Sequence, residues 1–334
     1  MPFVVKHSPY IMRVSYHELH DALCRALAKT GLASERAALC ARLIADSSRD
    51  GVESHGLNLF PRLLTMIRDG LVDVHARPAC ASRHGAIERW DGRRGPGNLN
   101  AYEAMDGAIA LARAHGVGCV ALSNTNHWMR GGTYGWQAAD AGVIGVCWTN
   151  TMPNLPPWGA DTPRIGNNPL VIAVPRPEGH VVLDMAMSQF SYGALASYRL
   201  RGEPLPVPGG FDREGALTRD PAAIEASRRP LPIGYWKGSG LALMLDMVAA
   251  LLAGGRATHE IPEQETGLSQ VFLAFDVAAI AGRDETTRVV EAILADLQVR
   301  YPGERTFDTR RQSVEDGVRV EPSAWRFLES AAAS

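Results

Sequence analysis

Residues 117–148, VGCVALSNTNHWMRGGTYGWQAADAGVIGVCW, decide the fold class that the sequence predicts. Val117 to Leu122 and Val143 to Trp148 are short apolar runs typical of strands, and Tyr134 to Ala141 between them is expected to be a helix. Strands that alternate with helices indicate an α/β domain whose sheet is covered by helices.

The alternation continues on both sides of this stretch. Further strands are expected at residues 87–90, 170–174, 181–183 and 271–275, and further helices at 101–114, 241–252 and 287–299. The segment from Pro204 to Gly215 is rich in proline and glycine. It predicts a long irregular connection of the kind that is either functional or mobile.

The first 70 residues have a helical pattern instead. Ser15 and Glu18 form a capping box that starts a helix running to about Thr30, and Ser34 is expected to cap a second helix that ends near residues 50–51. Pro61 suits the first turn of a third helix over residues 62–69. The sequence therefore predicts a helical N-terminal region ahead of the sheet.

Composition excludes several classes of protein. The 334 residues are 46% hydrophobic and 21% charged with a net charge of -2, which is typical of a globular chain and disfavours a nucleic-acid partner. Residues 1–13 lack a signal-peptide pattern, and no run of about 18 apolar residues suggests a membrane span. The five cysteines contain no C-x-x-C pair, so we expect reduced thiols in a cytoplasmic protein.

The tripeptide Ser54-His55-Gly56 is the first candidate for chemistry. It places a histidine, which exchanges a proton near neutral pH, beside a flexible glycine where the helical pattern breaks. His55 is therefore a candidate proton donor, and a hydrogen-bonded structural histidine is the alternative.

A second candidate is the start of the most apolar helix. Gly238-Ser239-Gly240 does not complete a G-x-G-x-x-G fingerprint, so an ordinary Rossmann crossover is not predicted. Free backbone amides at this helix start, with Lys237 beside them, would suit a nucleotide phosphate. The alternative is a tight turn into the helix.

Polar side chains follow the ends of two predicted strands. Residues 124–132 include His127 and Arg130, and Thr149 and Asn150 follow the next strand, so the two groups are expected at one edge of the sheet. Asp184 could orient a histidine, or could simply cap a turn or a helix. No H-E-x-x-H, paired-cysteine or G-x-S-x-G pattern supports a metal site or a nucleophile triad.

Taken together, these segments resemble the malate/L-lactate dehydrogenase family of NAD(P)-dependent oxidoreductases, which lack a Rossmann fold. The resemblance is carried by residues 51–58 (GVESHGLN), 126–132 (NHWMRGG), 134–139 (YGWQAA), 156–160 (PPWGA), 168–170 (NPL) and 234–240 (GYWKGSG). It implies a homodimer with an unusual α/β nucleotide-binding fold and an active site near the subunit contact.

The resemblance also implies residue roles. His55 would be the acid/base residue, supported by Ser54 and Asp184. Family contacts to the cofactor map onto His180, Val181, Val182, Leu183, Asp184, Met185, Ala186, Trp236, Lys237, Gly303, Glu304 and Arg305. The cofactor would be NAD(H) or NADP(H), with NADH slightly favoured. We expect residues 121–254 to form the NAD(P)-binding domain, and residues 1–120 with 255–334 a helical substrate-side and dimerisation domain.

One position departs from the family. Leu59 stands where a Ser-His-Gly-x-x-Arg pattern places an arginine that would pair with the substrate carboxylate. Arg62, one helical turn further, could reach toward the same place. The remaining candidates for positioning substrate or nicotinamide are His127, Arg130, Thr149 and Asn150.

The function that the resemblance implies is reduction of the C2 carbonyl of a small 2-keto acid, in the first place a sugar-derived diketo acid such as 2,3-diketo-L-gulonate. Within the family, the alternatives are dehydrogenation of malate, lactate or ureidoglycolate and reduction of a cyclic imine such as piperideine-2-carboxylate. A third possibility is a nucleotide-binding protein without turnover.

Overall fold

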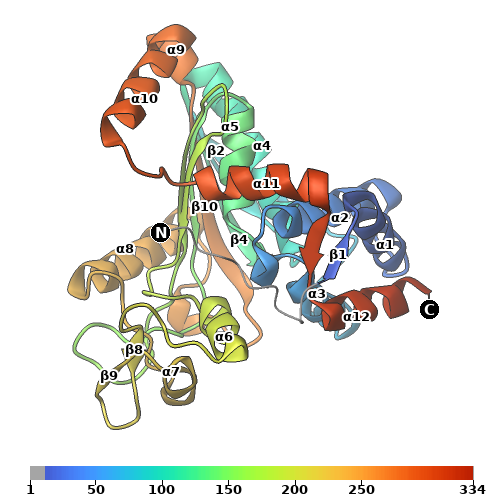
Figure 1. Cartoon of the computed structure of the whole chain (residues 1–334). Coiled ribbons are helices and arrows are strands. Elements are labelled where there is room, and N and C mark those ends of the chain that lie inside the picture. The colour runs from blue at the N-terminus through green and yellow to red at the C-terminus, as the bar shows by residue number, and fades with distance from the viewer. Residues whose placement is uncertain (1–11, 334) are drawn as a thin grey trace. The chain divides into compact units, whose positions relative to one another are not determined.

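The computed structural model describes residues 12–333, which fall into two compact units. Among the described residues, one unit comprises 12–75 together with 303–333, and the other runs from Ala76 to Pro302. Figure 1 shows the sheet of the second unit and the helices of both.

A seven-stranded sheet forms the centre of the second unit, in the order β2-β3-β4-β10-β5-β6-β7. Its strands are β2 (Ala79–His84), β3 (Ile87–Asp91), β4 (Val117–Asn126), β5 (Ile144–Thr149), β6 (Leu170–Val174), β7 (Val181–Met185) and β10 (Thr266–Phe275). The helices of this unit are α4 (Gly97–His115), α5 (Gly132–Asp140), α6 (Tyr192–Arg201), α7 (Pro221–Ser227), α8 (Trp236–Ala253), α9 (Val277–Ala281) and α10 (Arg283–Leu297), with a 3-10 turn η3 (Thr258–Glu260).

The direction of the strands decides where the candidate residues gather. Among the paired strands of this sheet, β3 and β4 are parallel and the other neighbours are antiparallel. Because β10 runs antiparallel to both β4 and β5, those two strands run the same way on either side of it. The carboxyl ends of β4 and β5 therefore lie at the same end of the sheet, as expected for the polar residues that follow them.

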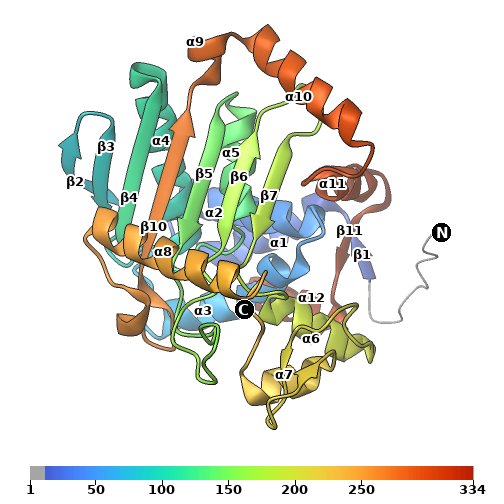
Figure 2. The same ribbon diagram turned by 90° about the vertical axis from the view of Figure 1, so that its left-hand side faces the viewer.

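Helices cover both faces of the sheet, which explains why its central strands read as continuous apolar runs. Cys119 and Ala121 of β4 lie in one core cluster with Ala242 and Leu245 of α8. Neighbouring side chains alternate between faces, so Val120 points to the opposite side, where α4 and α5 pack. Figure 2 shows α8 crossing the near face of the strands. The predicted α/β fold class is confirmed.

A small cluster outside the sheet contains α6, α7 and the hairpin of β8 (Gly210–Phe211) with β9 (Leu217–Thr218). Leu195, Leu205 and Ile224 form its core. The expected irregular connection at residues 204–215 thus contains a strand and a fully buried leucine. Its backbone is hydrogen-bonded to β9 and to the segment after it, through Gly209 N to Thr218 O (3.0 Å) and Leu205 N to Arg219 O (2.8 Å).

The first unit is helical, as predicted. It contains α1 (Tyr16–Ala28), α2 (Ser34–Arg49), α3 (Phe60–Arg68), α11 (Glu304–Asp316) and α12 (Pro322–Ala333), the 3-10 turns η1 (Glu53–His55) and η2 (Leu57–Leu59), and the antiparallel pair of β1 (Met12–Val14) with β11 (Val318–Val320). The Ser15–Glu18 capping box is confirmed. Ser34 is instead the first residue of α2 and makes no capping hydrogen bond, since Ala33 occupies the cap position.

The compact units do not follow the expected domain division. A boundary between residues 120 and 121 would cut β4 in the middle, and one at 254/255 would separate β10 from the sheet it completes. The sequence shows where strands begin, but strand pairing between distant segments decides which residues form one unit. The sequence does not predict the strands β1, β2, β8, β9 and β11 or the helices α6, α7, α9, α11 and α12.

Within residues 12–333, one helix, α8, has a length and composition that would also suit a membrane span. Ala242, Leu245 and Ala249 on one of its faces pack into the sheet, which is the arrangement of a core helix. Five cysteines are free thiols, and burial raises the pKa of Cys119 to about 11, so this thiol is protonated and unreactive at neutral pH.

Candidate active site

The Ser54-His55 pair lies in the short turn η1 that follows α2. The Ser54 hydroxyl is 2.9 Å from His55 Nδ1, and both side chains are half-buried. A hydrogen bond at Nδ1 limits rotation of the ring and influences which nitrogen carries the proton. The pair therefore has the arrangement of an oriented imidazole.

Gly56 holds this turn against α2. A Cβ at residue 56 would come within 2.9 Å of the Ser48 backbone nitrogen, a distance that real Cβ atoms do not show. The Ser48 hydroxyl also accepts a hydrogen bond of 2.9 Å from the Leu57 amide. The glycine is thus required by packing inside its own unit.

Position 59, where the family pattern has an arginine, ends the next turn, η2. Leu59 is half-buried, and Arg62 lies three residues on in the first turn of α3 with an exposed side chain. Residues three apart are neighbours on a helix surface, so the geometry agrees with the expected proximity of the two positions.

At the end of the sheet where β4 and β5 finish, the chain turns sharply after β4. Met129 has a left-handed φ of 64°, and its backbone amide donates to His127 Nδ1 over 3.1 Å. Because Nδ1 accepts a hydrogen bond here, the neutral ring carries its proton on Nε2. His127 therefore stabilises the turn that brings Arg130 to the start of α5.

The aromatic part of this motif belongs to the core. Trp128, Tyr134 and Phe272 are buried and their ring centroids lie 5.5–6.2 Å apart. The Tyr134 hydroxyl donates to the Trp128 carbonyl over 2.5 Å. These aromatic side chains therefore serve packing, in the middle of a segment whose polar residues are the candidates for ligand binding.

Asn150 is a structural link. Its side-chain amide donates to Asp246 Oδ1 (2.9 Å) and to the Arg256 carbonyl (2.8 Å), and its carbonyl accepts from the Ser269 amide (2.8 Å). The residue is fully buried, so its hydrogen-bonding groups join β5, β10 and α8 rather than a ligand. Thr149 is also buried and donates to the Asn150 carbonyl.

Asp184 caps α5. Its Oδ2 accepts a 2.8 Å hydrogen bond from the Gly132 amide, the first residue of that helix. A Cβ at Gly132 would come within 3.3 Å of Arg130 Nε and 2.8 Å of the same Oδ2, so the three residues share one small space. The sequence left a helix-cap role open for Asp184, and the structure shows that role. Arg130 lies beside this cap.

Most of the segment 180–186 forms β7 (Val181–Met185), an outermost strand of the sheet, which Figure 2 shows at one edge. Val182 donates to the Pro302 carbonyl (2.8 Å), so its backbone faces away from β6. Since facing alternates along a strand, the backbone of Asp184 also faces outward. His180, in the turn before β7, accepts from the Arg176 amide through Nδ1 (3.0 Å) and contacts Asp140 through Nε2 (2.9 Å).

The start of α8 differs from the expected phosphate cradle. The amides of Lys237 and Gly238 donate to the carbonyls of Gly234 and Ile233, so they are not available to an anion. What remains there is the Lys237 ammonium, 5.9 Å from the Trp236 ring centre, and an indole that is 65% exposed.

These features fit a dinucleotide in two ways. The outward-facing backbone of an edge strand can hydrogen-bond to a planar amide, and an exposed indole beside an ammonium can stack on a ring and pair with a phosphate. Gly303, at the start of α11, has a left-handed φ of 96° and follows Pro302. The sequence alone did not reveal the links through Asp246 and Pro302, because nothing in their local pattern marks them.

Comparison with known proteins places the chain in a family. The family model described as malate/L-lactate dehydrogenase matches residues 14–329. The 2,3-diketo-L-gulonate reductase of Klebsiella pneumoniae (strain 342) is 45% identical over 332 residues, covering 96% of this chain and all of the relative. The protein of the same name from Citrobacter koseri is 44% identical over 332 residues, covering 96% of this chain and all of the relative.

Solved structures agree. Delta1-piperideine-2-carboxylate reductase from Pseudomonas syringae is similar with a TM-score of 0.86 and 29% identity, covering 96% of this chain and 99% of that one. Sulfolactate dehydrogenase from Methanocaldococcus jannaschii gives a TM-score of 0.89 at 26% identity, with 96% and 97% covered. The match along nearly the whole length, in sequence and in fold, shows that this chain belongs to the malate/L-lactate dehydrogenase family.

Proposed function

We propose that this protein is an NAD(P)H-dependent reductase of a small 2-keto acid, with 2,3-diketo-L-gulonate as its substrate. The proposal is supported by family membership and by relatives of that name that are 44–45% identical over their full length. The observation that carries it is the His55 imidazole hydrogen-bonded to Ser54 in the turn that resembles the family's acid/base motif.

In the proposed mechanism, the reduced nicotinamide supplies the hydride when it is bound. Negative charge then grows on the C2 carbonyl oxygen, and His55 gives that oxygen a proton. Because Nδ1 lies against the Ser54 hydroxyl, the proton leaves from Nε2. Ser54 acts by holding the ring, and an exposed Arg62 is the candidate partner of the substrate carboxylate.

The cofactor would be held by this chain's own residues at three places. The outer edge of β7 offers backbone groups to the nicotinamide amide, Trp236 and Lys237 offer a ring face and an ammonium, and residues 303–305 follow in the chain from Pro302. NADH is the preferred nucleotide of the proposal. Titration of the protein with NADH and with NADPH, monitored by fluorescence energy transfer from tryptophan to the nucleotide, gives the two dissociation constants and so measures the preference.

The decisive test is His55→Ala. Removing a general acid lowers kcat by about 10²- to 10⁴-fold, while the dissociation constant of NADH stays within about twofold of the wild-type value. Ser54→Ala serves as the matched variant, because it keeps the imidazole and loses only its hydrogen bond, and its kcat falls less. A near-normal kcat in the His55→Ala protein would remove His55 from the mechanism.

A second candidate activity is reduction of a cyclic imine. Leu59 in place of the family arginine and the similarity to a piperideine-2-carboxylate reductase structure favour it. A panel of 2,3-diketo-L-gulonate, pyruvate, oxaloacetate and piperideine-2-carboxylate with both nucleotides separates the two, and reverse assays with malate, lactate and ureidoglycolate complete it. Nucleotide binding without turnover on any of these substrates would indicate a binding protein instead.

We also propose that the protein is a homodimer that uses the outer face of α8, and that it works in the cytoplasm, where its thiols stay reduced. Leu243, Met244, Met247 and Leu251 on this helix are exposed, and Leu251 is 77% exposed. The only charged residues of α8 are Lys237 at its start and the buried Asp246. An apolar face of this kind, nearly without charge, suits the same face of a second copy.

A further inference from the structure

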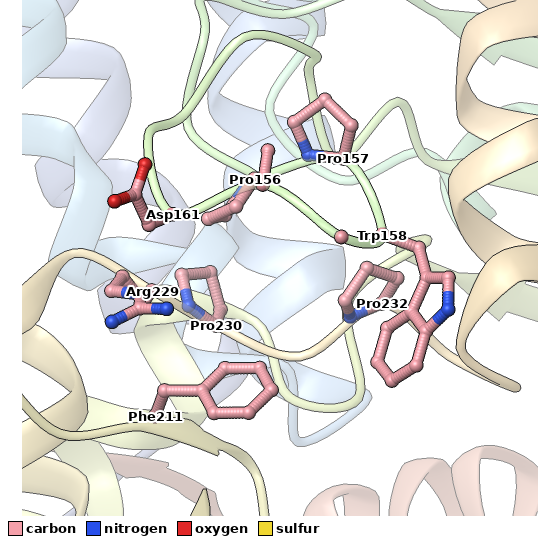
Figure 3. Close-up of a pocket in the computed structure, with 10 residues that line it drawn as sticks. Pro156, Pro157, Trp158, Asp161, Phe211, Arg229, Pro230 and Pro232 are labelled. Atoms are coloured by element: carbon pink, nitrogen blue, oxygen red, sulfur yellow. The ribbon is translucent and has the colours of Figure 1, made fainter. Parts of the chain in front are cut away.

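A pocket of about 440 Å³ lies outside the residues assigned to the reaction. Its walls come from two segments of the second unit: the loop 156–161 on one side, and Phe211 with residues 229–232 on the other. Figure 3 shows Arg229 at one end of this pocket and Trp158 at the opposite end, with proline rings between them. The volume is in the range of small-molecule sites.

The cation in this pocket has no acceptor. The Arg229 guanidinium lies 5.2 Å from the centre of the Phe211 ring, and none of its nitrogens makes a hydrogen bond or an ion pair with any residue between 12 and 333. Its Nε is shielded from solvent, so the side chain is held in place, while the two terminal nitrogens remain accessible. A half-buried guanidinium held over an aromatic ring, with no carboxylate of residues 12–333 within ion-pair distance, is prepared to receive an anionic group.

The wall that carries Arg229 is fixed on both sides by backbone hydrogen bonds. On one side the Phe211 amide donates to the Arg229 carbonyl (2.9 Å), and the Leu231 amide donates to the Gly209 carbonyl (2.8 Å). On the other side Gln189 donates to Leu231 (2.7 Å). Proline fixes its own φ, and four of the lining residues are prolines, so a ligand would bind without ordering this wall.

At the other end of the pocket, Trp158 is also held in place by its neighbours. The Trp158 amide donates to the Ser239 hydroxyl (3.0 Å), and its indole meets the Tyr235 ring edge-on with centroids 5.1 Å apart. The indole is nevertheless 48% exposed. A rigid, half-exposed tryptophan presents a flat face at low entropic cost.

We propose that this pocket is a second ligand site, distinct from the reductase site, for a small monocarboxylic acid with a flat apolar ring. The carboxylate pairs with the terminal nitrogens of Arg229, and the ring lies among the prolines toward Trp158. Asp161 lines the pocket near the same end as Arg229, so the site has one positive and one negative side chain. A singly charged acid therefore fits better than a phosphate dianion.

The binding test uses the full-length protein saturated with NADH, so that the cofactor site is occupied. Isothermal titration with benzoate is expected to give one site per chain. Benzamide, which has the same shape without the charge, and inorganic phosphate, which has charge without the ring, are expected to bind at least tenfold more weakly. Equal binding of phosphate and benzoate would show that the site takes any anion and would overturn the proposal.

The matched variants are Arg229→Met and Arg213→Met. Arg213 is an exposed arginine in the β8–β9 turn outside the pocket. Arg229→Met is expected to weaken benzoate binding about tenfold or more, while Arg213→Met leaves it unchanged. If both variants bind benzoate as the wild type does, the acid binds elsewhere.

Kinetics separate this proposal from the proposed reductase function. Arg229→Met is expected to retain wild-type kcat and KM for whichever keto acid the protein reduces, and saturating keto acid is expected not to displace benzoate. A raised KM in Arg229→Met, or displacement of benzoate by the keto acid, would make the pocket part of the reductase site. A shift of Arg229→Met from dimer to monomer without benzoate binding by the wild type would mean that a second copy covers the pocket.

Discussion

Gly56 illustrates how one residue controls the candidate acid. At this position the absence of a Cβ lets the turn with His55 approach α2, where a Cβ would come within 2.9 Å of the Ser48 backbone nitrogen. Backbone cannot move aside as a flexible side chain can, so a larger residue must displace the turn. A residue required by packing, Gly56, is therefore adjacent to the candidate acid, His55.

Gly56→Ala is expected to lower the free energy of unfolding by about 1–3 kcal/mol, the usual cost of overpacking. Gly240→Ala is the matched control, because no heavy atom lies within 4 Å of a Cβ there and alanine favours the interior of α8. Urea unfolding followed by circular dichroism measures both. A Gly56→Ala protein as stable as the wild type would show that the turn adapts easily.

The carboxylate-binding role of Arg62 is testable in the same unit. Arg62→Gln removes a charged hydrogen-bond donor and is expected to raise KM for the keto acid about ten- to a hundredfold, with a smaller change in kcat. Adding Leu59→Arg restores the arginine of the family pattern, and KM should fall again in the double variant. An unchanged KM in Arg62→Gln would assign the carboxylate to another cation.

At the scale of elements, capping contacts hold helices to strands that are far away in sequence. Asp184 of β7 accepts from the first amide of α5, 52 residues earlier. Arg113, at the end of α4, contacts Asp276 before α9 at 2.5 Å and also donates to the Ala141 carbonyl after α5. The end of α4 is thus tied to the residue that follows α5 and to the residue that precedes α9.

The contact of Arg113 with Asp276 gives a pH-dependent prediction. The hydrogen bond from Arg113 is the main cause that holds the pKa of Asp276 below its ordinary value of 3.8. A carboxyl whose pKa is lowered by folding stabilises the protein above its unfolded pKa, and the stabilisation is lost as pH falls through the folded pKa. Arg113→Met should therefore cost about 1 kcal/mol at pH 7 and progressively less below about pH 4.

Urea unfolding of both proteins between pH 7 and pH 3 checks this dependence. Arg288→Met is the control, since Arg288 pairs with Glu285 on the exposed surface of α10 and such pairs contribute little. A stability difference for Arg113→Met that stays constant as pH falls would mean that the arginine acts through packing or through the Ala141 carbonyl alone.

At the scale of the whole molecule, the proposed dimer rests on the outer face of α8. Leu251→Lys combined with Met247→Lys places two charges on this face and is expected to convert the protein to a monomer, because each charge would be buried unpaired in the interface. Sedimentation velocity measures the change.

Leu200→Lys, a charge at an equally exposed leucine on α6, should leave the sedimentation coefficient unchanged. A wild-type protein that sediments as a monomer, or a double variant that remains dimeric, would move the interface away from α8. If the active site is near the subunit contact, as the resemblance implies, the α8 variants also lose activity.

The sequence by itself determined the family, most strands of the central sheet and the helices that cover it. Capping boxes, apolar runs and the position of Pro61 are local signals, because a helix or strand depends mainly on its own residues, and α1, α3, β4 and β6 lie where these signals predict them within a few residues. The motif around His55 is likewise continuous in the chain.

Only the tertiary structure decided what the isolated polar residues do. The sequence offers Asn150 as a ligand-binding side chain, but its amide donates to Asp246, 96 residues later. The sequence likewise predicts free amides at the start of α8, but those of Lys237 and Gly238 donate to the carbonyls of Gly234 and Ile233. Arg229 shows the reverse, since nothing in its local pattern marks it, yet folding leaves its guanidinium without a hydrogen bond or ion pair to any residue from 12 to 333. Whether a polar group is available to a ligand depends on the hydrogen-bond partner that the fold brings to it. That partner is distant in sequence, so local patterns do not show it.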